Sequence, residues 1–254
     1  MFIPENWQDK LCLCAADSEG LSPAEVTRAV WNGQTVFVKS IGEAFSDTTY
    51  SVRREAEMMR WLNGKLSVPA VLDTGCENGR EYLVMSELRG RHIDDLQNDP
   101  EAYIRHLAGA VKALWRVEID GCPFDSKVDL RLRELRDLLD RGLADIDPSH
   151  WEPETGFDSP EALYRWLCEH KPQEELVFSH GDLAANFFVD GDTYRFYDLA
   201  RAGVADRMLD VAFCVRSIRD IDRDGTLEAR FYELLGEAPD REKINYYILL
   251  DEMF

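Results

Sequence analysis

Residues 180–186 read HGDLAAN and residues 197–201 read YDLAR, and these two stretches decide which fold and chemistry to expect. Asp182 and Asp198 each follow a short apolar run, and Asn186 lies between them. Phosphoryl transfer uses one carboxylate to orient and deprotonate the attacking hydroxyl, while an Asn oxygen and a second carboxylate hold magnesium on the nucleotide phosphates. The pattern predicts a kinase with Asp182 as the catalytic carboxylate, Asn186 and Asp198 as Mg²⁺ ligands, and ATP as the phosphate donor.

Other interpretations of these polar residues are weaker. Asp and Asn are common in turns, but such residues in loops between rigid apolar flanks favour a site, because the loops are accessible while their ends are fixed. His180 is expected to pack or to hold the loop rather than to act as a base. A Ser-His-Asp hydrolase is disfavoured because the sequence contains no Gly-x-Ser-x-Gly elbow. Asp206 is expected to cap the next helix, and Asp210 to accept hydrogen bonds from loop backbone.

The apolar pattern changes near residues 87–90, where a strand-rich part of the chain gives way to a helix-rich part. The first part is predicted to hold alternating strands and one amphipathic helix: strands at 26–31, 35–39, 69–72 and 81–86, with a turn at 32–34, and a helix at 49–63. The second part is predicted to hold helices and short strands: helices around 104–114 and at 130–143, 160–168, 207–219 and 242–250, and strands at 176–179, 187–189 and 194–197. We predict an α+β bilobal fold, with a small N-terminal β-rich lobe at residues 1–88 that binds nucleotide and a larger, mainly helical C-terminal lobe at residues 89–254.

The composition is that of an ordinary globular protein, with 254 residues, 45% hydrophobic and 31% charged. No apolar stretch approaches the roughly 20 residues that cross a bilayer, and the first residues lack the features of a secretion signal. The six cysteines are scattered without a C-x-x-C pair, which makes a zinc site improbable. We therefore expect reduced thiols in a cytoplasmic protein.

The formal net charge of −20 restricts the possible partners. Nucleic acids and anionic membranes are disfavoured, because binding them depends on Lys and Arg that neutralise phosphates. The acidic balance reflects either solubility alone or a cationic partner that it attracts and holds. Because ATP is itself an anion, a kinase this acidic must concentrate positive charge where the nucleotide binds.

Lys39 is the candidate for that positive charge. It shares one face of its predicted strand with Phe37, because side chains alternate along a strand, and an aromatic ring beside an ammonium suits adenine packing and phosphate pairing. A lysine at a strand end can also simply extend its charge into water. A lysine drawn into a cleft needs an anionic partner, for which Glu55 on the following helix is the candidate, although spacing alone does not separate Glu55 from Glu57.

With these residues in view, the chain resembles the bacterial aminoglycoside 3'-phosphotransferases, in particular the type III enzymes of Gram-positive bacteria. The resemblance extends over nearly the whole chain. The stretches that carry it are residues 19–24 (EGLSPA), 58–62 (MMRWL), 176–183 (LVFSHGDL), 212–219 (AFCVRSIR) and 246–254 (YYILLDEMF). The last two are specific to this group rather than to kinases at large. The resemblance implies a protein-kinase-like fold and ATP-dependent phosphorylation of the 3'-hydroxyl of kanamycin- and neomycin-class aminoglycosides, which confers resistance.

The resemblance also implies roles for individual residues. Lys39 would contact the α- and β-phosphates with Glu55 positioning it, and Phe37 would stack on adenine. The other implied nucleotide contacts are the backbone near Ser86 and Leu88 and the phosphate-covering loop at Ser22. The acids implied to bind the small-molecule aminoglycoside are Asp145, Asp147, Glu152, Asp220, Asp251 and Glu252, together with the terminal carboxylate of Phe254. Charge-assisted hydrogen bonds from the drug's ammonium groups to carboxylates are of the strong kind.

Two departures from the family pattern bear on activity. The family has four residues between the catalytic Asp and the Asn, whereas three separate Asp182 from Asn186. One residue is ~3.8 Å of chain, which is large beside a magnesium–oxygen distance of ~2.1 Å. Ser149 also stands where a close relative has an acidic drug contact. The alternatives are a kinase of the same fold acting on another small cationic metabolite, or a protein that binds nucleotide or drug without catalysis.

Overall fold

The computed structural model describes residues 1–14, 23–147, 151 and 155–254. They form two compact units, one of residues 1–92 with 186–202 and one of residues 93–185 with 203–254. The chain thus returns to the first unit late in the sequence, which no local pattern indicates. The boundary expected after residue 88 stays a prediction.

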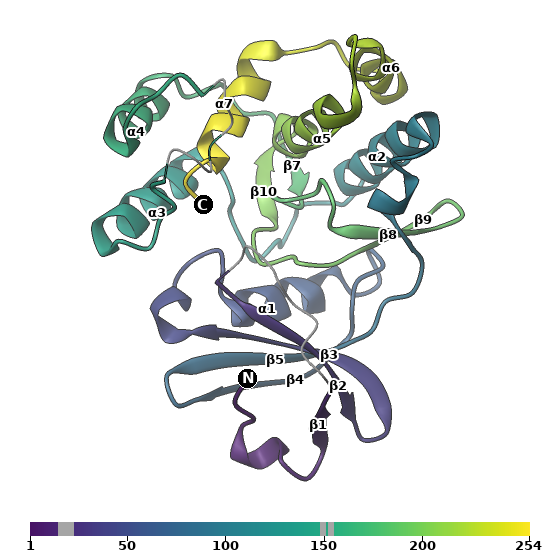
Figure 1. Cartoon of the computed structure of the whole chain (residues 1–254), viewed down its shortest axis with the longest axis vertical. Helices are drawn as coiled ribbons and strands as arrows, with labels where there is room; N and C mark the ends of the chain where they lie inside the picture. Colours follow the sequence, from purple (N-terminus) through teal and green to yellow (C-terminus); the bar gives the residue numbers. More distant parts are fainter. Residues whose placement is uncertain (15–22, 148–150, 152–154) are drawn as a thin grey trace. The chain divides into compact units, whose positions relative to one another are not determined.

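The first unit is built on an antiparallel sheet with the strand order β1-β2-β3-β5-β4 (Figure 1). Its strands are β1 (Leu11–Leu13), β2 (Glu25–Trp31), β3 (Gln34–Gly42), β4 (Val71–Glu77) and β5 (Arg80–Ser86). Asn32 and Gly33 join β2 to β3 with φ values of 48° and 82°, the left-handed pair that a two-residue hairpin turn requires. This confirms the hairpin expected near residues 26–39.

The hydrophobic core beside this sheet is built around Trp7, which is completely buried against inner residues of β3 and β5. Trp7 lies in a short 3-10 helix, η1 (Glu5–Trp7). Its indole N–H donates to Asp73 at 2.9 Å, and a Cβ on Gly75 would come within 3.3 Å of its ring. The strand predicted at residues 69–72 is therefore placed too early, since β4 spans Val71–Glu77. Contacts with Trp7 and pairing with β5 extend β4 through residues that have low intrinsic strand preference.

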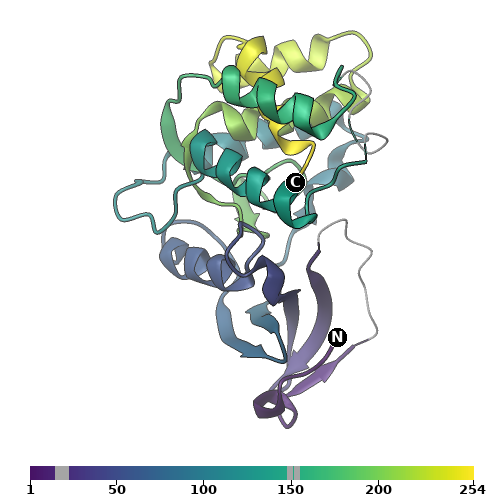
Figure 2. The ribbon, with the colours of Figure 1, turned by 90° about the vertical axis from the view of Figure 1, so that its left-hand side faces the viewer.

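One helix covers a face of this sheet, α1 (Val52–Leu62), which lies beside β3 and β5 (Figures 1 and 2). The sequence predicts it at residues 49–63. It begins at residue 52 because the Ser51 side chain accepts a hydrogen bond from the Arg54 N–H at 3.3 Å, which is an N-cap. A second 3-10 helix, η2 (Glu43–Phe45), precedes it.

The first unit also holds a small three-stranded sheet of order β6-β8-β9. Its strands are β6 (Arg91–His92), β8 (Phe187–Asp190) and β9 (Thr193–Phe196). Gly90 precedes β6 with a φ of 146°, and a Cβ there would meet the Phe188 side chain at 2.9 Å. A glycine is therefore required where β6 approaches β8.

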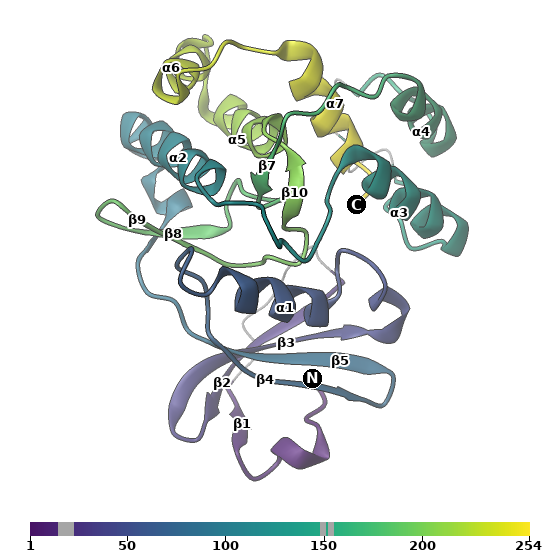
Figure 3. The same cartoon turned by 180° about the vertical axis from the view of Figure 1, so that it is seen from behind.

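The second unit consists mainly of helices around a two-stranded antiparallel pair, β7 (Leu176–Ser179) with β10 (Gly203–Asp206). The helices are η3 (Ile93–Leu96), α2 (Pro100–Trp115), α3 (Val128–Arg141), α4 (Pro160–Glu169), α5 (Met208–Ile221), α6 (Thr226–Leu235) and α7 (Arg241–Asp251). The C-terminus ends beside α3, as Figures 2 and 3 show, and the Arg131 guanidinium lies 6.0 Å from the centre of the Phe254 ring. None of the helices within the described ranges is long and apolar enough to span a membrane.

Most elements match the sequence-based prediction to within a few residues, and β7 matches it at both ends. The prediction lacks the strands β1, β6 and β10, the helix α6 and the short 3-10 helices. The signals for α6 are Gly225 and Gly236 at its two ends, both with left-handed φ. The strands β1 and β10 are three and four residues long, and they exist because β2 and β7 pair with them.

Candidate active site

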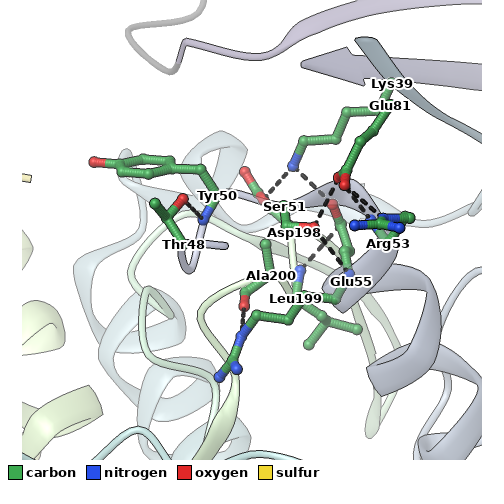
Figure 4. Close-up of polar contacts among 11 residues, drawn as sticks. Lys39, Thr48, Tyr50, Ser51, Arg53, Glu55, Glu81, Asp198, Leu199 and Ala200 are labelled. Atoms are coloured by element: carbon green, nitrogen blue, oxygen red, sulfur yellow. Dashed lines mark hydrogen bonds and ion pairs between the residues drawn. The ribbon is translucent and has the colours of Figure 1, made fainter. Parts of the chain in front are cut away.

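Lys39 is the centre of a buried charge network in the first unit (Figure 4). Its side chain projects from β3, and its Nζ lies 2.9 Å from Glu55 Oε2 and 2.5 Å from Asp198 Oδ1. Lys39 is 4% exposed and Glu55 is completely buried, whereas Glu57 is exposed. The structure thus pairs Lys39 with Glu55 and leaves Glu57 on the outer face of α1.

The two carboxylates decide the charge of this lysine. Burial by itself would lower the pKa of Lys39. Attraction to Asp198 and then to Glu55, together with the hydrogen bonds that Lys39 donates to both, instead raises this pKa above its ordinary value. The side chain is therefore an ammonium at neutral pH. A fixed, desolvated positive charge is what binding a polyphosphate in an acidic protein requires.

Glu55 also ties this network to the loop that follows β9. Its Oε1 accepts a hydrogen bond from the Leu199 N–H at 3.1 Å, while Oε2 faces Lys39 (Figure 4). The two oxygens of one carboxylate therefore fix both the lysine and the backbone next to Asp198. The Asp198 φ is +56°, a left-handed conformation that costs a non-glycine residue energy and that persists where surrounding contacts impose it.

Asn186 and Asp198 come together because they flank the β8–β9 hairpin. Phe187 pairs with Phe196 at the open end of the hairpin, and the Tyr197 N–H donates to the Asn186 carbonyl at 3.1 Å. The pairing continues to Asn186 despite the shortened loop before it. The Asp198 side chain is 37% exposed.

These residues fit a magnesium ion that is bound together with a nucleotide. One carboxylate and one amide oxygen are ligands that Mg²⁺ accepts, with phosphate oxygens and water completing the shell. Within the ranges that the structure describes, no group of three or more His, Cys, Asp or Glu side chains could hold a metal ion.

Phe37 and the segment after β5 are the expected adenine contacts. Phe37 is half-buried on the same face of β3 as Lys39. Ser86 ends β5, where its N–H donates to the Ala70 carbonyl at 2.9 Å and its hydroxyl accepts from the Ala70 N–H at 2.8 Å. Leu88 is half-buried just beyond it. Their contacts with a nucleotide stay predictions.

The loop that carries Asp182, in the second unit, is held by a buried carboxylate. Asp210 accepts hydrogen bonds from the His180 N–H at 2.8 Å, the Gly181 N–H at 3.0 Å and the Ser179 hydroxyl at 2.9 Å. This confirms the expectation that Asp210 binds loop backbone. Burial raises the pKa of Asp210, which the neighbouring His180 and these hydrogen bonds partly oppose. His180 is itself completely buried, which suits a residue that holds the loop.

A second contact fixes the same loop from α3. The buried Arg131 donates from Nη2 to the Gly181 carbonyl at 3.0 Å, so backbone groups just before Asp182 are bound on both sides. Asp182 is half-buried. Asp206 has a structural role, because it accepts from the Met208 N–H at 2.8 Å and from Lys243 at 2.9 Å. The N-cap residue of α5 is Arg207 rather than Asp206 as expected, and Arg207 makes no side-chain capping hydrogen bond.

The acids expected to bind a drug are found mainly near the C-terminus of the second unit. Asp251 binds Arg216 at 3.0 Å, and Glu252 accepts from the Thr155 hydroxyl at 3.3 Å. The Asp145 N–H donates to the Met253 carbonyl at 3.2 Å, which brings the segment after α3 to the chain end. Asp147 and Asp220 are exposed. Asp220 shares a face of α5 with Arg216, four residues earlier. Glu152, Ser149 and Ser22 lie outside the described residues.

Sequence reasoning missed two residues beside the charge network. Arg54 donates to the carbonyls of Ala200 and Ala202 at 2.7 and 3.3 Å. His92 bonds to the Tyr197 hydroxyl at 2.8 Å and packs edge-on against Phe188. Neither has a local signal, because the segments that they contact lie more than ninety residues away.

The sequence model of the phosphotransferase enzyme family matches residues 14–247, and the chain belongs to that family. The *Plasmodium vivax* ethanolamine kinase, at 13% identity and a TM-score of 0.57, shares the fold. The predicted protein-kinase-like α+β fold is thereby confirmed.

Within this family the chain groups with the aminoglycoside 3'-phosphotransferases. It is 54% identical to the *Campylobacter jejuni* enzyme of that name, over 97% of this chain and 98% of the relative, and 46% identical to the *Enterococcus faecalis* enzyme, over 95% and 93%. The crystal structure of a type VIII aminoglycoside-3'-phosphotransferase superposes with a TM-score of 0.78 at 26% identity, covering 96% and 94%. A *Streptomyces rimosus* aminoglycoside phosphotransferase in complex with ADP and streptomycin gives 0.76 at 25%, covering 90% and 89%.

Proposed function

We propose that this protein transfers the γ-phosphate of ATP to the 3'-hydroxyl of kanamycin- and neomycin-class aminoglycosides and so confers resistance to them. The observation that carries the proposal is the buried network in which Glu55 and Asp198 hold Lys39 as an ammonium. The identity to aminoglycoside 3'-phosphotransferases over nearly the whole chain supports the acceptor.

Binding of the nucleotide and its metal rests mainly on Lys39, Glu55, Asn186 and Asp198. Lys39 would bind the α- and β-phosphates, with Glu55 fixing its position. Asn186 and Asp198 would hold Mg²⁺, which when bound neutralises charge on the phosphates. Asp198 therefore serves both the lysine and the metal. Phe37 would stack on adenine, whose edge would meet backbone near Ser86 and Leu88, and Ser22 would lie over the phosphates.

The acceptor half rests on Asp182. Its carboxylate would accept a hydrogen bond from the 3'-hydroxyl and take its proton as the oxygen forms a bond to the γ-phosphorus. The bond from that phosphorus to the β-phosphate oxygen breaks, and ADP leaves. Contacts of Asp210 and Arg131 to the preceding backbone keep the loop rigid, which supports this role because a catalytic group acts only when it is positioned.

The acids expected to bind the drug would hold its ammonium groups by charge-assisted hydrogen bonds. They are Asp145, Asp147, Glu152, Asp220, Asp251, Glu252 and the terminal carboxylate of Phe254. The net charge of −20 favours the approach of such a polycation. A neutral or anionic acceptor would gain nothing from this cluster.

The test is ADP release in a coupled assay with kanamycin A and with an analogue that lacks the 3'-hydroxyl. We expect Mg²⁺-dependent turnover of kanamycin A and none of the analogue. Product formation from the analogue would show that a hydroxyl other than the 3'-hydroxyl is phosphorylated. Turnover of choline without turnover of kanamycin would assign a different cationic acceptor, and tight binding of both ligands without ADP release would indicate a binding protein.

A further inference from the structure

The first turn of helix α1 contains Arg53, Arg54 and Glu55, and the charge network around Lys39 explains only Glu55. Arg54 is half-buried. Its guanidinium donates from Nε to the Ala200 carbonyl at 2.7 Å and from Nη2 to the Ala202 carbonyl at 3.3 Å. Both carbonyls belong to the loop that directly follows Asp198.

This loop depends on contacts from α1 for its shape. Asp198 has a left-handed φ, and such a conformation persists when neighbouring contacts determine it. Glu55 binds the Leu199 N–H, and the Ala202 N–H closes a turn on the Leu199 carbonyl at 3.1 Å. Two adjacent residues of α1 therefore hold the loop, one by accepting from its N–H and the other by donating to its carbonyls.

We propose that Arg54 is a positioning residue for Asp198 and that it acts on the affinity of the site for the divalent cation. The inference rests on the proposed function in one respect only, the assignment of Asp198 as a metal ligand. Without the guanidinium, two carbonyls lose their donor and the loop gains other conformations. The Asp198 carboxylate then spends less time where the metal and Lys39 require it, so metal binding weakens although no ligand has been removed.

Arg54 can act in this way because its own backbone is fixed. Its N–H binds the Ser51 hydroxyl oxygen at 3.3 Å, and the same hydroxyl donates to the buried Glu81 at 2.7 Å. The first turn of α1 is therefore anchored to β5. A planar guanidinium can donate to two separate carbonyls from one rigid fork, whereas a lysine ammonium is a single point charge on a flexible stem. Arg54→Lys should retain part of the effect.

The chain offers a matched control in the adjacent arginine. Arg53 donates from Nε to Glu81 at 2.5 Å, and its side chain is 60% exposed. Its guanidinium is thus directed to β5 rather than to the loop. Arg53→Gln removes the same charge from the same turn of the same helix, so it measures what a general disturbance of α1 does to the site.

The primary readout is Mn²⁺ binding to the full chain in the presence of ADP, followed by the electron paramagnetic resonance signal of free Mn²⁺. It needs no acceptor, so it is independent of the aminoglycoside assignment. We expect Arg54→Gln to weaken Mn²⁺ binding about tenfold, Arg54→Lys to weaken it less, and Arg53→Gln to leave it unchanged. In turnover, the Mg²⁺ concentration for half-maximal rate should rise in the same order while the KM for aminoglycoside stays constant.

Unchanged Mn²⁺ affinity in the Arg54 variants would overturn the proposal, whatever their thermal stability, because a merely structural arginine changes stability alone. An equal loss in Arg53→Gln would overturn it as well. If Arg54→Gln does not fold, the comparison of Arg54→Lys with Arg53→Lys decides by the same criteria. A wild-type protein that binds Mn²⁺ with ADP but phosphorylates no aminoglycoside would remove the proposed acceptor and leave this test intact.

Discussion

The charge network of the first unit and the exposed acids expected to bind a drug in the second unit use carboxylates in opposite ways. In the first unit, Glu55 is completely buried, and its two oxygens have defined partners in Lys39 and the Leu199 N–H. In the second unit, Asp147 and Asp220 are exposed at the surface. Buried, paired carboxylates fix one geometry because desolvation makes any mispairing costly. Exposed carboxylates attract cations of varied shape, and each contributes a smaller free energy because water competes.

The largest effect is expected at Asp182, which is proposed to take a proton rather than to hold a charge. Replacing it with Ala should lower kcat by about 10²–10⁴-fold, the usual contribution of a positioned general base, while ATP binding is retained. Steady-state kinetics with kanamycin A and calorimetry with ATP measure the two quantities. Asp192→Ala, in the exposed turn between β8 and β9, is the control. Equal turnover by Asp182→Ala would refute the base assignment.

The next largest effect is expected at Glu55, where a substitution tests its buried pairing with Lys39. Glu55→Gln leaves Lys39 in a buried site with one anionic partner fewer, so the free energy of unfolding should fall by about 3 kcal/mol. Glu57→Gln lies two residues along the same helix and is exposed, so the change there should stay within about 0.5 kcal/mol. Urea unfolding curves measure both. Equal losses for the two variants would show that burial does not distinguish them.

A smaller effect is expected for an acid near the C-terminus. Glu252→Gln removes one charge-assisted hydrogen bond to the drug, so the KM for kanamycin A should rise about tenfold without a change in the KM for ATP. The rise should shrink in high salt because ionic strength screens exposed charges. Glu242→Gln, at an exposed position near the start of α7, the helix that ends just before Glu252, controls for net charge. A change confined to the KM for ATP would assign Glu252 to nucleotide binding instead of drug binding.

The smallest effect concerns pH. The pKa of Lys39 is raised in the folded state, so its stabilising contribution is fully present below the unfolded value of about 10.4 and is lost as pH rises through the folded pKa. The difference in unfolding free energy between wild type and Lys39→Met should therefore not decline between about pH 6 and about pH 9. Urea unfolding at several pH values measures it. A difference that already declines within that window would mean that the lysine is not held as an ammonium.

The order of strands and helices was largely predictable, because apolar periodicity records which face of an element is buried. The errors occur where long-range contacts override local preference. β4 extends through Asp73 and Gly75 because Trp7 packs there. β10 forms because β7 supplies a partner. The site was predictable as a set of residue types but not as a set of pairs, since spacing left Glu55 and Glu57 equivalent.

Local patterns of residue type were enough to predict the family, the α+β class, and the Lys, Asn and Asp residues that we propose for phosphoryl transfer. The tertiary structure alone decided that Glu55 faces Lys39, that Asp198 adopts a left-handed backbone, and that Arg54 binds the loop beyond it. Lys39 and Asp198 are 159 residues apart in the chain. Contacts over such separations depend on how the whole unit packs, and no window of sequence contains that information.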